Sequence, residues 1–478
     1  MKTPEPLTPA FAGVSGGIRE GANVKGVTTS PDHASTAVLR RAILAIALPA
    51  MLTNVATALF GLADMWVIGR LGDAAAQGGV EVGAKLLMSL LVVFNFLRSS
   101  TVALTAQAAG RGDADGQAGA LVRATGVALA IAVVLFAVEP LVVPLGLGMF
   151  GAKAGVAVLA RRYVEIRYWG ALPWLLNAVL AGWLIGQRRV RAVLAVEVGS
   201  NLLHIALDVG LVLGLGLGVA GVAAATLTSE TAKFLALAVV AARQGAAREA
   251  LRLVSHRATW AWSEVGALLR LNRDLFGRTL LLMAATVLLT RAGAGQGAVV
   301  LSANAILYQL FMLSALLLDG FESSAQVLCG EALGAGRRGE FGRLVRAILA
   351  WGWGLALVIA LGYAVFGREL AASFSTAPEV IATVQRYIGW AVLMPVVGVT
   401  SFVFDGVFIG SSWTRAMLVS MAAALGGFLV MLWLARGWGN DGLWLAFSLF
   451  FVLRAAAQAV LMPGLVRRSF GDAAVGAG

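Results

Sequence analysis

The sequence AILAIALPAMLTNVATALFGLADMWVIG occupies residues 42–69 and carries one full charge, the carboxylate of Asp64. The run is longer than the ~20 residues that an α-helix needs to cross a bilayer. A carboxylate inside such a span costs roughly 3 kcal/mol or more unless it faces a protein interior or water, or carries a proton. Asp64 is therefore either a group that handles ions or protons, or a side chain near a helix end that reaches the interface.

The whole chain has the composition of a helical membrane protein. Of its 478 residues, 59% are hydrophobic and 13% are charged, whereas about a quarter of the residues of a soluble domain are charged. The net charge is +12, but the arginines gather between apolar runs, as in membrane topology signals, so we expect no nucleic-acid partner. The single cysteine, Cys329, excludes an internal disulfide, and the three histidines are too scattered for a zinc site.

Twelve apolar runs predict an all-α polytopic membrane protein with twelve transmembrane helices. They fall near residues 42–69, 82–109, 120–148, 163–186, 192–214, 217–242, 265–292, 297–329, 342–366, 382–410, 413–435 and 441–466. Pro49, Pro173 and Pro395 lie inside three of these runs and predict kinks.

The distribution of lysine and arginine predicts the orientation. Basic residues dominate alternate connections, including the long stretch 243–273, so we expect both termini and this stretch to be cytoplasmic. Leucine and tryptophan side chains among its arginines suggest that the stretch lies along the inner surface of the cytoplasmic membrane. The first residues contain no apolar signal segment, and the first span would act as the insertion signal.

The chain repeats itself at a constant spacing. Ile185-Gly186 recurs as Ile409-Gly410, and the Arg-Ala motif that begins at Arg191 recurs, equally far along the chain, at Arg415. We call the interval from Ile185 to Ile409 the repeat spacing. Six spans separate the copies, so both halves start on the same side of the membrane and form parallel repeats. The predicted organisation is a disordered tail (1–40), a six-helix bundle (41–242), a basic linker (243–264), a second six-helix bundle (265–470) and a short tail (471–478).

Two carboxylates break this repeat. Asp64 and Asp208 lie in the first half, and the residue one repeat spacing after Asp208 is Leu432. A carboxylate that the fold requires would be expected in both halves. We therefore interpret these residues as a site confined to the first bundle.

The fifth span carries a polar stripe beside this site. His204 and Asp208 are four residues apart and share one helical face, with Asn201 one turn earlier. Polar stripes facing a bundle interior are typical of ion-handling sites, and the alternative is a hydrogen-bond clamp between helices. Thr226 in the sixth span offers a hydroxyl to the same site, although membrane threonines usually bond to their own helix.

The second half has polar islands of its own, at Asn304, Gln309, Asp319, Glu322 and Asp405. We consider them candidates for a substrate cavity, and Asp319 and Asp405 serve equally well as structural partners of an arginine. No ATP-binding loop, catalytic triad or metal cluster is present in the sequence, so we expect no enzymatic activity and no cofactor.

Several of these short motifs occur in a familiar order and spacing. They are Leu62-Ala63-Asp64, Leu207-Asp208 followed by Gly218-Val219-Ala220-Gly221, Leu301-Ser302-Ala303-Asn304, Leu318-Asp319-Gly320-Phe321 and Phe404-Asp405-Gly406-Val407-Phe408-Ile409-Gly410. Over residues 40–470 the chain resembles the MATE family (multidrug and toxic compound extrusion), most closely its DinF-type branch.

The resemblance implies a fold and a function. Twelve helices would form two bundles arranged as a V, which opens alternately to either side and exports substrate against entering protons or Na⁺. It also implies an acidic first-bundle site at Asp64, Asp208 and Thr226. Members usually carry asparagine where this chain has His204, and imidazole suits a proton better than Na⁺.

We therefore expect a secondary antiporter that exports amphipathic, cationic or zwitterionic organic compounds, acting as a monomer in the lipid membrane. The coupling ion would be H⁺, with Na⁺ as the alternative. A flippase for a lipid-linked precursor is a second hypothesis, but it should line its cavity with arginines, and few lie within spans. An intramembrane enzyme is a third, with His204 and Asp208 as its only candidate pair.

Overall fold

A computed structural model describes residues 36–149, 151 and 154–471, and within these ranges all regular structure is helical. Twelve helical segments of the described chain are long and apolar enough to cross a membrane, as the sequence predicts. The predicted tails lie mostly outside the described residues. The first helix already begins at Thr36, so the predicted tail boundary at residue 40 falls inside it.

The first half contains six of these spans. Its helices are α1 (Thr36–Gly69), α2 (Ala74–Val92), α3 (Phe96–Gly110), α4 (Ala114–Met149), α5 (Ala154–Arg167), α6 (Ala171–Gly186), α7 (Val190–Asp208) and α8 (Gly218–Ala242). The pairs α2 and α3, and α5 and α6, each make one span, joined by the 3-10 turns η1 (Val93–Asn95) and η2 (Tyr168–Gly170).

The second half contains the other six spans. They are α10 (Trp262–Ala294), α11 (Ala298–Gly334), α12 (Arg338–Ala372), α13 (Pro378–Gly410), α14 (Thr414–Leu434) and α15 (Gly439–Phe470), the last preceded by the turn η5 (Arg436–Trp438). The halves are connected by a short helix, α9 (Ala246–Val254), and the turn η4 (Arg257–Trp260). Because α10 begins at Trp262, the amphipathic connection is shorter than the predicted 243–273 stretch.

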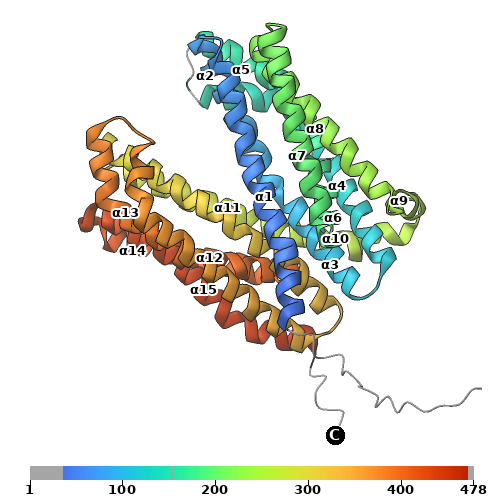
Figure 1. Cartoon of the computed structure of the whole chain (residues 1–478). Coiled ribbons are helices and arrows are strands. Elements are labelled where there is room, and N and C mark those ends of the chain that lie inside the picture. Colours follow the sequence, from blue (N-terminus) through green and yellow to red (C-terminus); the bar gives the residue numbers. More distant parts are fainter. Residues whose placement is uncertain (1–35, 150, 152–153, 472–478) are drawn as a thin grey trace, which may run out of the picture.

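The two halves form the arms of a V (Figure 1). One arm holds α2, α5, α7 and α8, and the other holds α12 to α15, while α1 and α11 run from the closed end along their facing sides. Packing joins α1 to both α7 and α11. The start of α1 and the end of α15 lie together at the closed end.

The helix breaks only partly follow the prolines. Pro173 follows the break at η2, where the first turn of a new helix tolerates it. Pro49 and Pro395 lie inside the uninterrupted helices α1 and α13. The other breaks within spans, at η1 and at the π-helical segment η3 (Val209–Gly214), contain no proline.

Close helix contacts confirm the internal repeat. A Cβ atom on Gly182 would come within 2.6 Å of the carbonyl oxygen of Arg98, and one on Gly406 would meet the carbonyl oxygen of Glu322 in the same way. The repeat spacing relates Gly182 to Gly406, and it also relates Arg98 to Glu322. Each half therefore uses glycine at the same place to bring two backbones into contact.

A second repeated feature is the turn that follows these glycines. Arg188 and Ser412 are the non-glycine residues with positive φ in the described backbone, at 62° and 56°. They too are separated by the repeat spacing. Such backbone is uncommon for L-residues, so its recurrence confirms that the halves share one fold.

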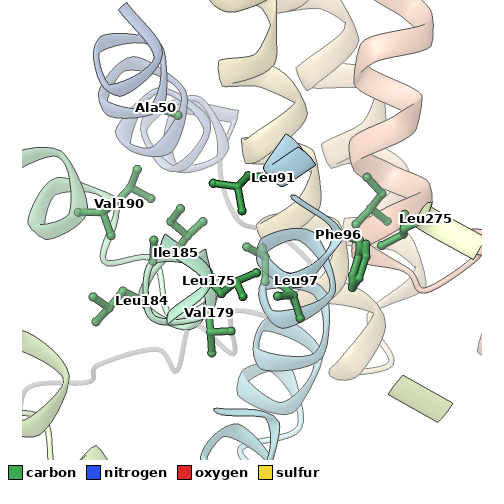
Figure 2. Packing of buried hydrophobic residues seen from close by; sticks show 14 of the residues in the cluster. Ala50, Leu91, Phe96, Leu97, Leu175, Val179, Leu184, Ile185, Val190 and Leu275 are labelled. Atoms are coloured by element: carbon green, nitrogen blue, oxygen red, sulfur yellow. The ribbon is translucent and has the colours of Figure 1, made fainter. Parts of the chain in front are cut away.

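Polar contacts tie the arms together at the closed end. Gln107 of α3 donates to the carbonyl oxygen of Gly410 at 2.7 Å and to Ser412 Oγ at 2.9 Å. Arg188 Nε lies 2.7 Å from Glu331 Oε2 of α11. Apolar packing continues this junction, with Phe96 of α3 beside Leu275 of α10 (Figure 2). We call the Arg188–Glu331 pair the latch.

Candidate functional site

Three titratable side chains meet inside the first arm. Asp64 comes from the C-terminal half of α1, and His204 and Asp208 come from consecutive turns of α7. Asp64 is 7% exposed, and His204 and Asp208 are 0% exposed. The predicted i,i+4 face of the fifth span therefore carries both α7 residues, and Asp64 approaches them from the neighbouring helix.

His204 lies between the two carboxylates. Its Nε2 is 2.5 Å from Asp64 Oδ1 and 3.0 Å from Asp208 Oδ2. Its other ring nitrogen, Nδ1, is 3.3 Å from Ser229 Oγ of α8. The Ser229 hydroxyl in turn donates to the carbonyl oxygen of Thr226 at 3.0 Å. The triad of Asp64, His204 and Asp208 is thus held by three helices.

This geometry constrains the hydrogens of the imidazole. When both carboxylates are ionised, the nitrogen that faces them must carry a hydrogen, because an ionised carboxylate cannot donate one. Since the Ser229 hydroxyl donates to the backbone, its oxygen is free to accept a hydrogen from Nδ1. The arrangement therefore fits an imidazolium that bridges two carboxylates, with a local charge of −1.

The same distances fit a hydrogen bond better than metal ligation. The ligand-type atoms of the triad lie within 4.8 Å of one another, so by residue type the group is able to hold a metal ion. Two nitrogen or oxygen atoms that bind one zinc ion tetrahedrally, each about 2.0 Å from the metal, are about 3.3 Å from each other. His204 Nε2 and Asp64 Oδ1 are only 2.5 Å apart. That spacing is typical of a charge-assisted hydrogen bond.

Two further residues predicted for this site make their contacts elsewhere. Thr226 is fully buried, and its hydroxyl donates to the carbonyl oxygen of Val222 at 3.0 Å, the back-bond expected of membrane threonines. Asn201 donates to the carbonyl oxygen of Ala56 at 3.0 Å. Asn201 therefore joins α7 to α1, one turn below the triad, and does not contact the carboxylates directly.

A second charged cluster joins α7 to α8, and it includes Glu197, which the sequence analysis missed. Glu197 is buried on α7, and its Oε2 lies 2.8 Å from Lys233 Nζ of α8. Glu230, three residues before Lys233 on α8, is more distant from Nζ at 3.9 Å and accepts a hydrogen bond from Asn177 at 2.8 Å. The spacing of Glu197, Asn201, His204 and Asp208 at three or four residues is the signal that identifies Glu197 as part of the same stripe.

The polar residues of the second arm form a separate group. Asp405 is fully buried, accepts from Gln458 Nε2 at 2.8 Å and from Arg454 Nε at 3.1 Å, and is ion-paired with Arg278. Asp319 and Glu322 interact electrostatically with these arginines. Asp405 therefore has the contacts of the structural alternative, a partner of arginines.

The two remaining cavity candidates differ from each other. Asn304 exchanges side-chain hydrogen bonds with Asn440 at 2.8 and 2.9 Å and accepts from Trp444 Nε1 at 2.8 Å, so it clamps α11 to α15. Gln309 is exposed on α11. Neither contacts the charged group around Asp405 through a recorded hydrogen bond within the described residues.

Comparisons with known proteins agree with this architecture. The MatE family model matches residues 49–210 and 276–433, one segment in each half. DNA damage-inducible protein F of Escherichia coli is 34% identical over 426 residues, which cover 88% of this chain and 91% of that protein. A probable multidrug resistance protein NorM of Rhizobium meliloti is 26% identical over 442 residues, which cover 88% of this chain and 92% of that protein.

Solved structures share the fold. The bent form of the Vibrio cholerae MATE transporter VcmN has a TM-score of 0.80 at 19% identity, covering 91% of this chain and 99% of that one. A MATE transporter in the straight conformation has a TM-score of 0.80 at 18% identity, and the match covers 90% of this chain and 97% of that one.

Proposed function

The chain belongs to the MatE family of multidrug and toxic compound extrusion transporters, and we propose that it is an antiporter that exports amphipathic cationic or zwitterionic compounds against protons. The observation that carries the proposal is the position of His204 Nε2, 2.5 Å from Asp64 and 3.0 Å from Asp208. A buried group of two carboxylates and one imidazolium changes its net charge when it binds a single proton.

The proposed cycle follows from that charge. With both carboxylates ionised and His204 protonated, the triad has a charge of −1 and attracts a cationic substrate. A proton that enters from outside and binds Asp64 or Asp208 brings the charge to zero and removes that attraction. Substrate and proton therefore compete for one site, which is the minimum that antiport requires.

The imidazole favours protons over Na⁺ in this scheme. Na⁺ needs several oxygen ligands, whereas His204 places a hydrogen-bearing nitrogen between the two carboxylates. Its positive charge also occupies the position that a bound cation would take. Na⁺ coupling remains the alternative outcome of the experiment below.

We further propose a setting for this activity. The protein would act as a monomer in the cytoplasmic membrane, with both termini and α9 on the cytoplasmic side. In that orientation the V of Figure 1 opens to the outside. The latch and the Gln107 hydrogen bonds would then close the cytoplasmic side.

A lipid-linked precursor flippase is less well supported. Such a protein needs arginines free to bind pyrophosphate. Arg278 and Arg454 are both paired with the buried carboxylate of Asp405, so both guanidinium groups are already engaged by the protein.

The test is transport by the purified protein in proteoliposomes. An imposed pH gradient should drive uphill movement of a fluorescent organic cation, and an imposed Na⁺ gradient should not. If only the Na⁺ gradient drives movement of the organic cation, the coupling ion is Na⁺ and not the proton. Insensitivity to both gradients, in vesicles that still exchange substrate for substrate, would contradict coupling altogether.

A further inference from the structure

A cavity of about 630 Å³ lies at the closed end of the first arm, away from the triad. It is lined by the ends of α6 and α8 and the beginnings of α4, α7 and α9. Arg189 and Arg243 contribute two guanidinium groups, and Gln187 and Gln244 contribute amides. Nothing in the proposed transport cycle uses this cavity.

The charges around the cavity favour an anion. Arg189 and Arg243 are exposed, and neither makes an ion pair with any residue that the structure describes. The one acidic side chain in the lining, Glu249, pairs with Arg252, whose Nε is 3.0 Å away and which also pairs with Asp115. Together with Arg189 and Arg243, these groups carry three positive and two negative charges, so the net charge around the cavity is positive.

Backbone groups add to this preference. Ala192 in the first turn of α7 and Ala246 at the start of α9 line the cavity, and neither helix has a side-chain cap at its N-terminus. Uncapped helix starts present free N–H groups and a partial positive charge. The start of α4 contributes less, because Asp113 already accepts from the backbone N–H of Gly116 at 2.7 Å.

The surroundings place the cavity next to an apolar surface. Leu251 of α9 is 72% exposed and Trp262 at the start of α10 is 77% exposed, with Val254 between them half exposed. Exposed apolar side chains on a short basic helix are typical of a segment that lies in the membrane interface. An anion at this depth is available from phospholipid headgroups as well as from solution.

One turn connects the cavity to the contact between the arms. Gln187 and Arg189 line the cavity, and Arg188 between them forms the latch with Glu331 of the second arm. The backbone N–H of Arg188 donates to the carbonyl oxygen of Ile185 at 2.8 Å, and that of Arg189 donates to the carbonyl oxygen of Leu184 at 2.9 Å, so both residues are held in one hydrogen-bonded turn. A ligand that fixes Arg189 would also fix the backbone that holds the latch.

We propose that this cavity binds a phosphate-bearing ligand, through Arg189, Arg243 and the free N–H groups of α7 and α9. The shared chemistry is a phosphate mono- or diester, supplied either by an anionic phospholipid headgroup or by a soluble phosphate compound. Its occupation stabilises the closed latch and therefore slows the change of the V to the opposite-facing state.

The test measures binding to the full-length protein purified in a neutral detergent. Native mass spectrometry would follow the anionic lipid dioleoylphosphatidylglycerol, with dioleoylphosphatidylcholine as the zwitterionic lipid of zero net charge and glycerol 3-phosphate as the soluble phosphate. The variant Arg189→Ala/Arg243→Ala removes both lining arginines. The matched control, Arg191→Ala/Arg248→Ala, removes one exposed arginine of α7 and one of α9. Neither of these arginines lines the cavity.

We expect the cavity variant to bind phosphatidylglycerol roughly 25-fold more weakly, about fivefold for each arginine, and the control to bind within about twofold of wild type. If glycerol 3-phosphate displaces phosphatidylglycerol, the site is assigned to soluble phosphates. If phosphatidylglycerol stays bound, the site is assigned to lipid. Equal weakening in both variants, or no binding of either phosphate compound to the wild type, would overturn the proposal. Transport measurements are not needed for this decision, so it stands apart from the proposed antiport.

Discussion

Replacing Asp405 by asparagine should destabilise the second arm rather than uncouple transport. Asp405 is 0% exposed and Arg454 is 1% exposed, so both charges are buried. The carboxylate accepts from Gln458 and Arg454 and is ion-paired with Arg278. Asparagine keeps one acceptor oxygen and loses the charge, which leaves two guanidinium groups without their shared partner.

The expected loss is about 3 kcal/mol in the free energy of unfolding, at the lower end of the ~3–5 kcal/mol typical of a broken buried ion pair. The lower end applies because Asp319 and Glu322 interact with the same arginines and compensate part of their charge. Unfolding of the purified protein in detergent, followed by thermal or denaturant titration, measures this loss. A second variant, Asp405→Asn/Arg454→Gln, should recover part of it because one uncompensated charge is removed.

Asp64→Asn is the matched comparison. After this change His204 still contacts Asp208, so the destabilisation should be near ~1 kcal/mol, the value of one hydrogen bond. Uphill transport should nevertheless be abolished, whereas folded Asp405→Asn protein should keep partial activity. An unaltered unfolding midpoint for Asp405→Asn would refute the structural assignment. Total loss of transport in both variants, with normal folding, would mean that one functional site spans both arms.

Three further predictions address coupling, orientation and the closed end. His204→Asn should shift the pH profile of transport and introduce a response to Na⁺, because the cation between two carboxylates is replaced by an amide; an unaltered profile in proteoliposomes would make the histidine structural. Ser255→Cys should resist a membrane-impermeant thiol reagent added to intact cells and react after lysis, since the native Cys329 is fully buried; labelling from outside would reverse the orientation. Arg188→Ala should weaken the latch and slow the cross-linking of a cysteine pair placed across the closed end; an unaltered rate would leave the Gln107 contacts as the main closure.

The architecture was largely predictable because its signals are local. A span is recognised from about twenty consecutive apolar residues, and all twelve predicted runs correspond to helices of the described chain. The repeat was visible in short motifs such as Ile185-Gly186 and Ile409-Gly410, and these are the positions where glycine allows backbone contact. The breaks at η1 and η3 contain no proline, and nothing in their sequence distinguishes them from continuous helix.

The site was predictable only along a single helix. His204 and Asp208 lie on one face of α7, which the i,i+4 rule identifies without any tertiary knowledge. Ion-pair partners that lie on two different helices are not identified by this spacing rule. Spacing alone would pair Lys233 with Glu230, three residues earlier on the same helix, but Glu197 of the neighbouring helix lies closer, at 2.8 Å against 3.9 Å. Sequence spacing cannot rank a local partner against one that tertiary packing supplies.

The contrast between Asp64 and Asp405 has the same origin. Both are aspartates in apolar spans, and the cost of a charge in lipid applies equally to each. Asp405 meets two guanidinium groups, which keep their charge at any physiological pH, so its surroundings are permanently neutralising. Asp64 shares the single cation of His204 with Asp208, so this group has one carboxylate more than it has cations and is able to take up a proton. In the proposed antiporter, a structural carboxylate therefore differs from a coupling one in the balance of charge among its partners, and Arg454 and His204 lie 49 and 140 residues from their carboxylates in the chain.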